Sequence, residues 1–233
     1  MKALYLIPAR GGSKGIPGKN IKPFLDKPLI CHAIDQAMEV AAEDDEICVS
    51  TDSEEIKAVV EDYDLPVPFL RPDCLATDTA GTYEVILHAL QWYKECGKEF
   101  DVVILLQTTS PLRRTQDIRD AIRLWHPGID MVVSVCEAAT NPYFNAYETD
   151  SEGNLHISKG DGHYVRRQDA PKVWEYNGAV YVMSVESLRK MPYSKFPVRR
   201  PLVMPAGRSV DLDTPADWLR AEQLAKDLPV SGL

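Results

Sequence analysis

The chain has 233 residues, 45% of them hydrophobic and 26% charged, and a formal net charge of −9. This is enough to bury one sizeable core, and no apolar run reaches the length of about 18 residues that predicts a membrane span. The negative charge argues against binding to nucleic acid. Five scattered cysteines without a CxxC pair argue against a disulfide framework and against a zinc site. Because free cysteines are typical of a reducing compartment, we predict a cytoplasmic protein.

Short apolar runs alternate with helix-period segments along the chain. The first run, residues 3–7, indicates a buried strand rather than a signal peptide, because its apolar stretch ends near Arg10 without a small-residue cleavage site. Later runs rich in Val, Ile and Leu predict strands at residues 47–50, 102–106, 131–136 and 179–183. Such continuous runs are typical of strands covered on both faces.

Helices are predicted between these strands. Cap residues predict three helix starts, at Ser53, Thr115 and Thr214. A fourth helix is predicted from an apolar face formed by Ile86, Ala89, Leu90 and Tyr93. The alternation of strand and helix predicts an α/β fold with a mostly parallel sheet, helices on both faces, and ligands bound at the carboxyl ends of the strands.

Residues 140–176 interrupt this alternation. The segment is polar, aromatic and basic, and a stretch of this length inside a domain is usually functional. We therefore predict a single domain over residues 1–233 that carries residues 140–176 as an extension. Residues 229–233 are predicted to be a frayed tail, Arg199 and Arg200 a surface pair, and the five histidines structural.

A cationic, glycine-rich loop follows the first predicted strand. Residues 8–20 contain four glycines together with Arg10, Lys14 and Lys19, which suits phosphate oxygens because glycines let backbone N–H groups turn inward. The loop matches neither the Walker motif nor the dinucleotide fingerprint. The alternative, a solvated basic turn, rarely needs so many glycines and cations directly after a buried strand.

Two further strand ends carry chemistry. Gln107 offers a donor and an acceptor that suit the edge of a base, although a local hydrogen-bonding role is the alternative. Asp211 and Asp213 stand two residues apart, and two carboxylates so close are costly unless a cation such as magnesium lies near them. The alternative for Asp213 is a helix cap without metal. For Arg71, an anion contact and an ordinary salt bridge both remain open.

In chain order, residues 7–20, 49–53, 71–72, 75–80, 106–113, 176–181 and 210–214 resemble the motifs of the acylneuraminate cytidylyltransferases, the CMP-sialic acid synthetases. The resemblance spans nearly the whole chain. The KDO cytidylyltransferases fit less well, because their first loop is spaced differently and is poor in glycine. The resemblance implies a Rossmann-like nucleotidyltransferase fold and a homodimer in which residues 140–176 form a small dimerisation extension that reaches onto the partner.

The resemblance also implies roles for individual residues. The triphosphate would be held by Arg10, Ser13 and Lys19, with Lys14 nearby. Ribose and cytosine would be fixed by Asn20, Arg71, Thr82 and Gln107. Magnesium would be organised by Asp211 and Asp213, and the acidic sugar contacted by Arg167, Asn177 and Tyr181. The predicted catalytic residues are Arg10, Lys19 and Asp211, with Asp211 as the general base.

The predicted reaction joins CMP, from CTP, to a nine-carbon 2-keto acid sugar of the sialic acid type and releases pyrophosphate. Phe144 stands where the resemblance leads us to expect a lysine, which leaves N-acetylneuraminate, KDN, legionaminate and pseudaminate open as the sugar. Two alternatives are a nucleotidyltransferase acting on a sugar 1-phosphate and a non-catalytic nucleotide-binding subunit. The second would require loss of the phosphate loop or of the acidic pair, and the sequence contains both.

Overall fold

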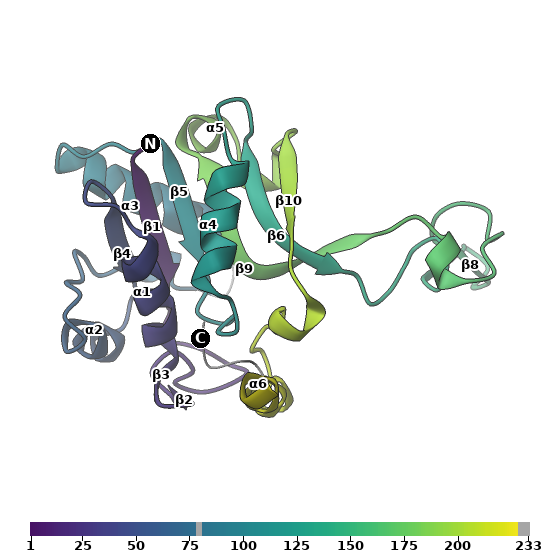
Figure 1. The fold of residues 1–233 in the computed structure, drawn as a ribbon, viewed down its shortest axis with the longest axis horizontal. Coiled ribbons are helices and arrows are strands. Elements are labelled where there is room, and N and C mark those ends of the chain that lie inside the picture. The colour runs from purple at the N-terminus through teal and green to yellow at the C-terminus, as the bar shows by residue number, and fades with distance from the viewer. Residues whose placement is uncertain (78–80, 228–233) are drawn as a thin grey trace.

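A six-stranded sheet in the order β10-β6-β9-β5-β1-β4 forms the centre of the molecule (Figure 1). The computed structural model describes residues 1–77 and 81–227, so the motif residues 78–80 and the predicted tail at 229–233 lie outside the described residues. The strands of the sheet are β1 (Ala3–Pro8), β4 (Glu46–Ser50), β5 (Val102–Leu106), β6 (Met131–Glu137), β9 (Trp174–Ser184) and β10 (Arg199–Val203). The five strands predicted from apolar runs are confirmed.

Five of these strands run in one direction, and β9 runs antiparallel between β5 and β6. The prediction of a mostly parallel sheet is therefore confirmed. The prediction for β9 covered only its buried second half, because its first three residues, Trp174, Glu175 and Tyr176, are exposed and do not continue the apolar run. Since β9 is reversed, its first half lies at the edge where the parallel strands end. A β-bulge separates the pair Val133–Tyr181 from the pair Val135–Tyr176 and distorts β9 at that edge.

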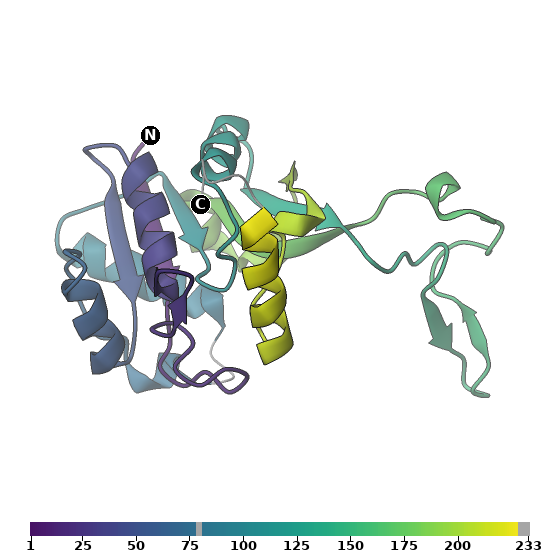
Figure 2. The same ribbon diagram turned by 60° about the horizontal axis from the view of Figure 1, so that its bottom comes forward.

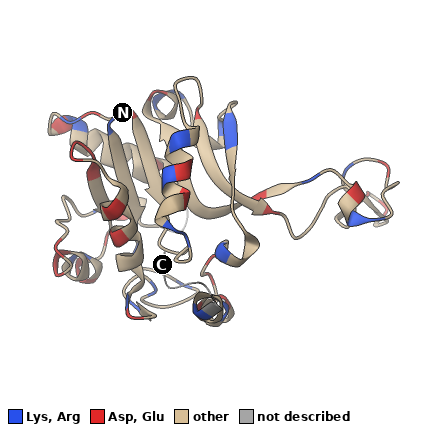
Figure 3. Ribbon diagram, in the orientation of Figure 1, with Lys and Arg blue, Asp and Glu red and all other residues tan. Residues whose placement is uncertain are grey.

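Helices cover both faces of the sheet, as predicted. One face packs against α1 (Leu29–Val40), α2 (Glu54–Glu61) and α4 (Thr115–Leu124). The other face packs against α3 (Thr82–Glu95) and α5 (Val185–Lys190). The strands carry few charged residues, while both signs of charge are spread over the helices and loops (Figure 3). This distribution fits strands that are buried on both sides.

The last helix, α6 (Pro215–Asp227), lies at the carboxyl edge of the sheet, away from the two faces (Figures 1 and 2). Its residues Trp218, Ala221 and Ala225 pack against a small core formed by Ile16, Phe24, Leu29, Leu112, Val210 and Leu212. This core joins the glycine-rich loop and the short hairpin β2 (Pro23–Phe24) and β3 (Lys27–Pro28) to the C-terminal part of the chain. Residues from opposite ends of the sequence are therefore held together.

Two of the three predicted helix caps are confirmed. The Ser53 side chain accepts a hydrogen bond from the Ile56 amide, 3.3 Å away. The Thr214 hydroxyl accepts from the Asp217 amide, while the Asp217 carboxylate accepts from Thr214, which forms a capping box. The prediction at Thr115 was wrong by one residue, because Arg114 occupies the cap position and its amide donates to the Asp117 carboxylate.

Arg199 and Arg200 are exposed, as predicted for a surface pair, but they also lie in strand β10, which the sequence did not predict. Both residues belong to this edge strand, which pairs with β6 through Arg199–Met131 and the following residues. The strand has only one buried residue, Leu202, and contains Pro201, so its pattern did not indicate a strand. An edge strand tolerates proline because only one of its sides pairs.

Residues 140–173 leave the body between β6 and β9 and project far from it (Figures 1 and 2). They contain the hairpin β7 (Tyr147–Thr149) and β8 (Leu155–Ile157). Several large apolar side chains of this extension are exposed, among them Tyr147, Leu155 and Val165. Among the described residues, no helix combines the length and the apolar character needed to cross a bilayer.

Candidate active site

The glycine-rich loop and the twin-aspartate segment meet at the carboxyl edge of the sheet. The Lys19 ammonium donates a hydrogen bond of 2.6 Å to the Leu212 carbonyl and lies 3.6 Å from the Asp213 carboxylate. A Cβ atom placed on Gly15 would lie 2.1 Å from the Asp213 carbonyl oxygen, so only glycine fits there. Segments almost 200 residues apart in sequence thus form one wall of a site.

The acidic segment is anchored by its middle residue. Leu212 is fully buried, and its amide donates to the Thr109 carbonyl at 2.9 Å. Asp211 and Asp213 flank it on the solvent side. Asp211 stays accessible to solvent, yet the surrounding protein removes enough water to raise the pKa of its carboxyl, and Asp213 raises it further, while a hydrogen bond from the Thr109 side chain opposes the shift. Because Thr214 and Asp217 form the helix cap, the Asp213 carboxylate is not used as one.

The loop itself is anchored at several points. Ile16 is buried in the small core beneath α6, so residues 8–20 are not merely a solvated turn. Of its glycines, Gly18 has a positive φ of 62°. The Gly11 amide does not point toward an open phosphate site as predicted, because it donates to the Asp52 carboxylate at 3.0 Å. Asp52 follows β4 and supports the loop, a role that no sequence motif indicated.

Four of the residues predicted to bind nucleotide line one cavity of about 330 Å³ beside the loop, namely Arg10, Arg71, Thr82 and Gln107. Its remaining lining comes from Pro8, Leu75, Thr77, Val85, Thr108 and Thr109. Thr82 is the first residue of α3, so the positive end of that helix faces the cavity. The volume falls within the usual range for small-molecule sites, roughly 300–1,000 Å³.

Arg71 and Asn20 make extensive contacts within the protein. The Arg71 guanidinium donates to the Ser50 side chain and carbonyl and to the Leu75 carbonyl. Arg71 is 6% exposed. Its hydrogen bonds show neither an anion contact nor a salt bridge, the two roles left open for it. They show instead that Arg71 fixes the loop that borders the cavity. The Asn20 amide donates to the Arg10 carbonyl and accepts from the Thr108 hydroxyl. Contacts of Arg71 and Asn20 with the nucleotide stay predictions.

The three residues predicted to contact the sugar lie in different settings. Asn177 is buried in the β9 bulge, where its amide donates to the Ser209 hydroxyl at 2.8 Å. Tyr181 is 7% exposed and packs beneath the sheet edge, where burial raises the pKa of its phenol. Arg167 belongs to the extension and donates to the carbonyls of Ala138 and Ala139. Contacts of these residues with a sugar stay predictions.

The positions of Lys14 and Ser13 complete the predicted set. Lys14 is exposed on the loop, and the Ser13 amide donates to the Gly11 carbonyl at 3.0 Å. Both residues lie on the same turn as Arg10 and Lys19. Of these four residues, Arg10 lines the cavity and Lys19 contacts the acidic segment.

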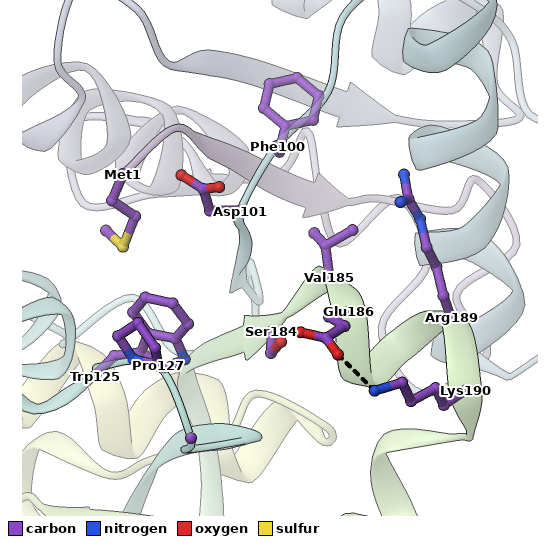
Figure 4. A pocket seen from close by; sticks show the side chains of 11 residues that line it. Met1, Phe100, Asp101, Trp125, Pro127, Ser184, Val185, Glu186, Arg189 and Lys190 are labelled. Atoms are coloured by element: carbon purple, nitrogen blue, oxygen red, sulfur yellow. Dashed lines mark hydrogen bonds and ion pairs between the residues drawn. The ribbon is translucent and has the colours of Figure 1, made fainter.

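A larger cavity of about 730 Å³ lies at the opposite, amino-terminal edge of the sheet (Figure 4). Phe100, Trp125 and Val185 supply its apolar lining. Two cations on its border are already paired, since Lys190 contacts Glu186 at 2.6 Å and Arg189 contacts Glu99 at 3.2 Å. None of the residues predicted for the site lines it. Ligands of such sheets bind at the carboxyl ends of strands, so the smaller cavity is the candidate active site.

The acidic pair fits a magnesium ion only together with a substrate. Within residues 1–77 and 81–227, no cluster of three or more histidine, cysteine, aspartate or glutamate side chains could hold a metal. Asp211 and Asp213 offer carboxylate oxygens next to the cationic loop. Magnesium is commonly held in this way, by one or two carboxylates and the phosphates of a nucleotide.

Comparison with known proteins agrees with this geometry. A family model described as cytidylyltransferase matches residues 4–196. CMP-N,N'-diacetyllegionaminic acid synthase of Legionella pneumophila is 35% identical over 226 residues, 96% of each chain. N-acylneuraminate cytidylyltransferase of Streptococcus agalactiae serotype III is 34% identical over 94% of this chain, which spans 52% of that protein.

The fold is shared with a solved structure as well. The structure of CMP:2-keto-3-deoxy-manno-octonic acid synthetase complexed with CTP is similar with a TM-score of 0.71 and 21% identity, and the match covers 98% of this chain and 100% of the other. At that identity the likeness concerns the fold alone. The family model matches residues 4–196 and the Legionella relative covers 96% of the chain, which therefore belongs to the cytidylyltransferase family.

Proposed function

We propose that this enzyme transfers CMP from CTP to the anomeric hydroxyl of a nine-carbon 2-keto acid sugar of the sialic acid type, with release of pyrophosphate. The observation that carries the proposal is the contact between the cationic loop and the acidic segment beside a cavity of about 330 Å³. The names of the relatives support an acidic sugar as acceptor, and diacetyllegionaminic acid is the first sugar to test.

In this reaction the anomeric oxygen forms a bond to the α-phosphorus of CTP, and the bond from that phosphorus to the bridging oxygen breaks. Asp211 accepts the proton of the hydroxyl, for which its raised pKa is suited, because a base is most effective when its pKa lies closer to the working pH. Arg10 and Lys19 neutralise the charge that develops on the phosphates. Gln107 contacts the edge of cytosine.

Magnesium is the proposed cofactor, held by Asp211 and Asp213 together with the phosphates. When bound, it would supply Lewis-acid stabilisation of the phosphate oxygens. The residues of the chain still orient the nucleotide and hold the proton, because phosphoryl transfer depends mainly on positioning and electrostatics. All five cysteines are free thiols, which supports a cytoplasmic location.

The activity is tested with purified protein, CTP and magnesium, by measuring pyrophosphate release with a panel of acceptors. We expect release with legionaminate, pseudaminate, KDN or N-acetylneuraminate, and none when the metal is chelated. Sugar 1-phosphates are the matched comparison. Release with a sugar 1-phosphate but with no free keto acid would contradict the proposed acceptor, and CTP binding without any turnover would favour a non-catalytic subunit.

We further propose that residues 140–173 pack against a second copy of the chain. Leu155 and Val165, on this extension, are 70% and 88% exposed. Large apolar side chains that are exposed on a projecting segment favour contact with another protein surface. The double variant Leu155→Asp, Val165→Asp is expected to sediment as a monomer, whereas the wild type sediments as a dimer.

The control for the dimer experiment is Leu219→Asp. Leu219 is 67% exposed on α6, outside the extension, so its replacement places a negative charge on an exposed apolar position elsewhere. This variant should keep the dimer. A monomeric wild type, or a double variant that remains dimeric in analytical ultracentrifugation, would contradict the proposed role of the extension.

A further inference from the structure

Arg113 is a buried arginine in the loop between β5 and α4, and its side chain donates hydrogen bonds to three segments of the chain. Its side chain is among the largest that are fully buried, with 1% exposure. The Nε atom donates to the Gln36 side-chain oxygen of α1 at 2.9 Å. One terminal nitrogen donates to the Gln107 carbonyl at 3.2 Å and to the Ala179 carbonyl at 2.6 Å. Burial lowers the pKa of its guanidinium to about 10, so it remains protonated near neutral pH.

The bridge from Gln107 to Ala179 lies where the ladder between β5 and β9 ends. Leu106 and Val180 form the last regular pair of these strands. Beyond it, β9 bulges, and its Val180 amide donates to the Ser134 hydroxyl. Arg113 therefore satisfies two carbonyls beyond the end of the ladder, and a buried carbonyl without a donor would be costly.

These two carbonyls belong to opposite halves of the candidate site. Gln107 lines the nucleotide cavity. The bulge carries Gly178, where an added Cβ would lie 3.5 Å from the Gln107 side-chain oxygen and 3.8 Å from the Asp211 carboxylate. The bulge backbone thus lies between the residue proposed to contact cytosine and the proposed base.

Three of the residues between Gln107 and Arg113 form a hydrogen bond to a neighbouring segment. The Thr108 hydroxyl donates to Asn20, at the base of the glycine-rich loop. The Thr109 carbonyl accepts from Leu212, in the acidic segment. The Ser110 hydroxyl donates to the Asn177 carbonyl at 3.2 Å. Loop 107–113 therefore contacts the glycine-rich loop, the acidic segment and the β9 bulge. Arg113, at its end, donates to the carbonyl of Gln107, at its start.

We propose that Arg113 is a positioning residue that fixes the backbone of Gln107 and the β9 bulge relative to each other, and thereby sets both the choice of base and the geometry at Asp211. This inference rests on the proposed function. A glutamine amide that is free to turn can match either cytosine or uracil, since it has a donor and an acceptor. Discrimination between the two bases therefore requires that the residue is held in place.

The test compares Arg113→Lys with wild type in two measurements. Lysine keeps the charge but cannot donate to Gln36, Gln107 and Ala179 together, because it lacks the planar fork of arginine. We expect the dissociation constant for CTP, measured by calorimetry without sugar, to rise about 2–30-fold, the range for residues that act on a site without touching its ligand. The ratio of CTP to UTP affinity should fall about tenfold or more, since that ratio depends on well-placed polar groups.

A second variant keeps the inference testable if Arg113→Lys folds poorly. Gln36 on α1 is absent from the lining of the nucleotide cavity, and Gln36→Met removes its hydrogen bonds to Arg113 while keeping its length. We expect this variant to lose base discrimination in the same direction. The control is Trp125→Phe, which removes a side-chain hydrogen bond to the Ile129 carbonyl at the far edge of the sheet. It should leave both nucleotide affinities unchanged.

The outcomes separate the inference from the function on which it rests. Arg113→Lys and Gln36→Met proteins that are destabilised but keep the wild-type CTP to UTP ratio would show a merely structural role and overturn the inference. A wild type that binds CTP over UTP but releases no pyrophosphate with any sugar would overturn the proposed reaction, while the inference would still be judged by the two affinities. Wild-type protein that does not discriminate between the bases would overturn the inference.

Discussion

Replacing Asp211 by asparagine is expected to lower kcat by about 10²–10⁴-fold, the range that a positioned general base contributes, while CTP still binds. Asparagine keeps the shape of the side chain and can still pair with Thr109, but it cannot accept the proton of the sugar hydroxyl. The measurements are kcat from pyrophosphate release and CTP affinity from calorimetry. Asp217→Asn is the control, because it removes a carboxylate from the nearby capping box while the asparagine side-chain oxygen can still accept from the Thr214 amide.

The same substitution should stabilise the protein without ligand. The pKa of Asp211 is raised in the folded state, so ionising this carboxyl costs more in the folded chain than in the unfolded chain. The contribution of protonated Asp211 to the free energy of unfolding is fully present below the ordinary aspartate pKa. It is lost as pH rises through the raised pKa of Asp211 in the folded chain. At neutral pH, Asp211→Asn removes this cost, and the free energy of unfolding should rise.

The pH dependence of the wild-type enzyme should agree with this assignment. Activity requires ionised Asp211, so kcat/KM for CTP, which reports the pKa values of the free enzyme, is expected to fall as pH is lowered through this raised pKa, at a higher pH than for an ordinary aspartate. Near-normal kcat in Asp211→Asn, or an acidic limb that is unchanged in that variant, would show that another group accepts the proton.

The sequence predicted the parts of the fold that depend on local patterns. The apolar runs of β1 and β5 identify buried strands because both faces of these strands are covered, and Thr214 before Pro215 marks the start of α6. Strand β10 escaped prediction because an edge strand with proline and one buried residue has no periodic pattern. The direction of β9 also escaped, since the direction of a strand depends on how the chain returns to the sheet.

The candidate site was predicted at the level of segments more than of single side chains. The strand-end rule places Gln107 at the carboxyl edge, and the structure brings the Asp211 segment to the same edge through the hydrogen bond from Leu212 to Thr109. The inward contacts of Asn20 and Asn177 were not predictable, because the sequence does not show whether an asparagine amide faces a ligand or a neighbouring protein group. Arg113 was missed for a similar reason, since a buried arginine cannot be told from an exposed one by sequence.

The approach of the loop to the acidic segment depends on Gly15. An added Cβ there would lie 2.1 Å from the Asp213 carbonyl oxygen, and that atom belongs to a backbone held by the Lys19 and Thr109 hydrogen bonds. The clash cannot be relieved by turning a flexible side chain. Gly15→Ala must therefore push the loop away from the acidic segment or distort both.

Gly15→Ala is expected to lower kcat/KM for CTP by about 10²-fold, because a displacement on the order of 1 Å between phosphate-binding and acidic groups has this effect on positioned reactants. Overpacking of this kind should also cost about 1–3 kcal/mol in the free energy of unfolding, measured with denaturant. The control is Gly207→Ala, where an added Cβ meets nothing within 4 Å, so both quantities should stay near wild type. If Gly15→Ala behaves like this control, catalysis does not need the close contact between the loop and Asp213, and the site is assembled in some other way.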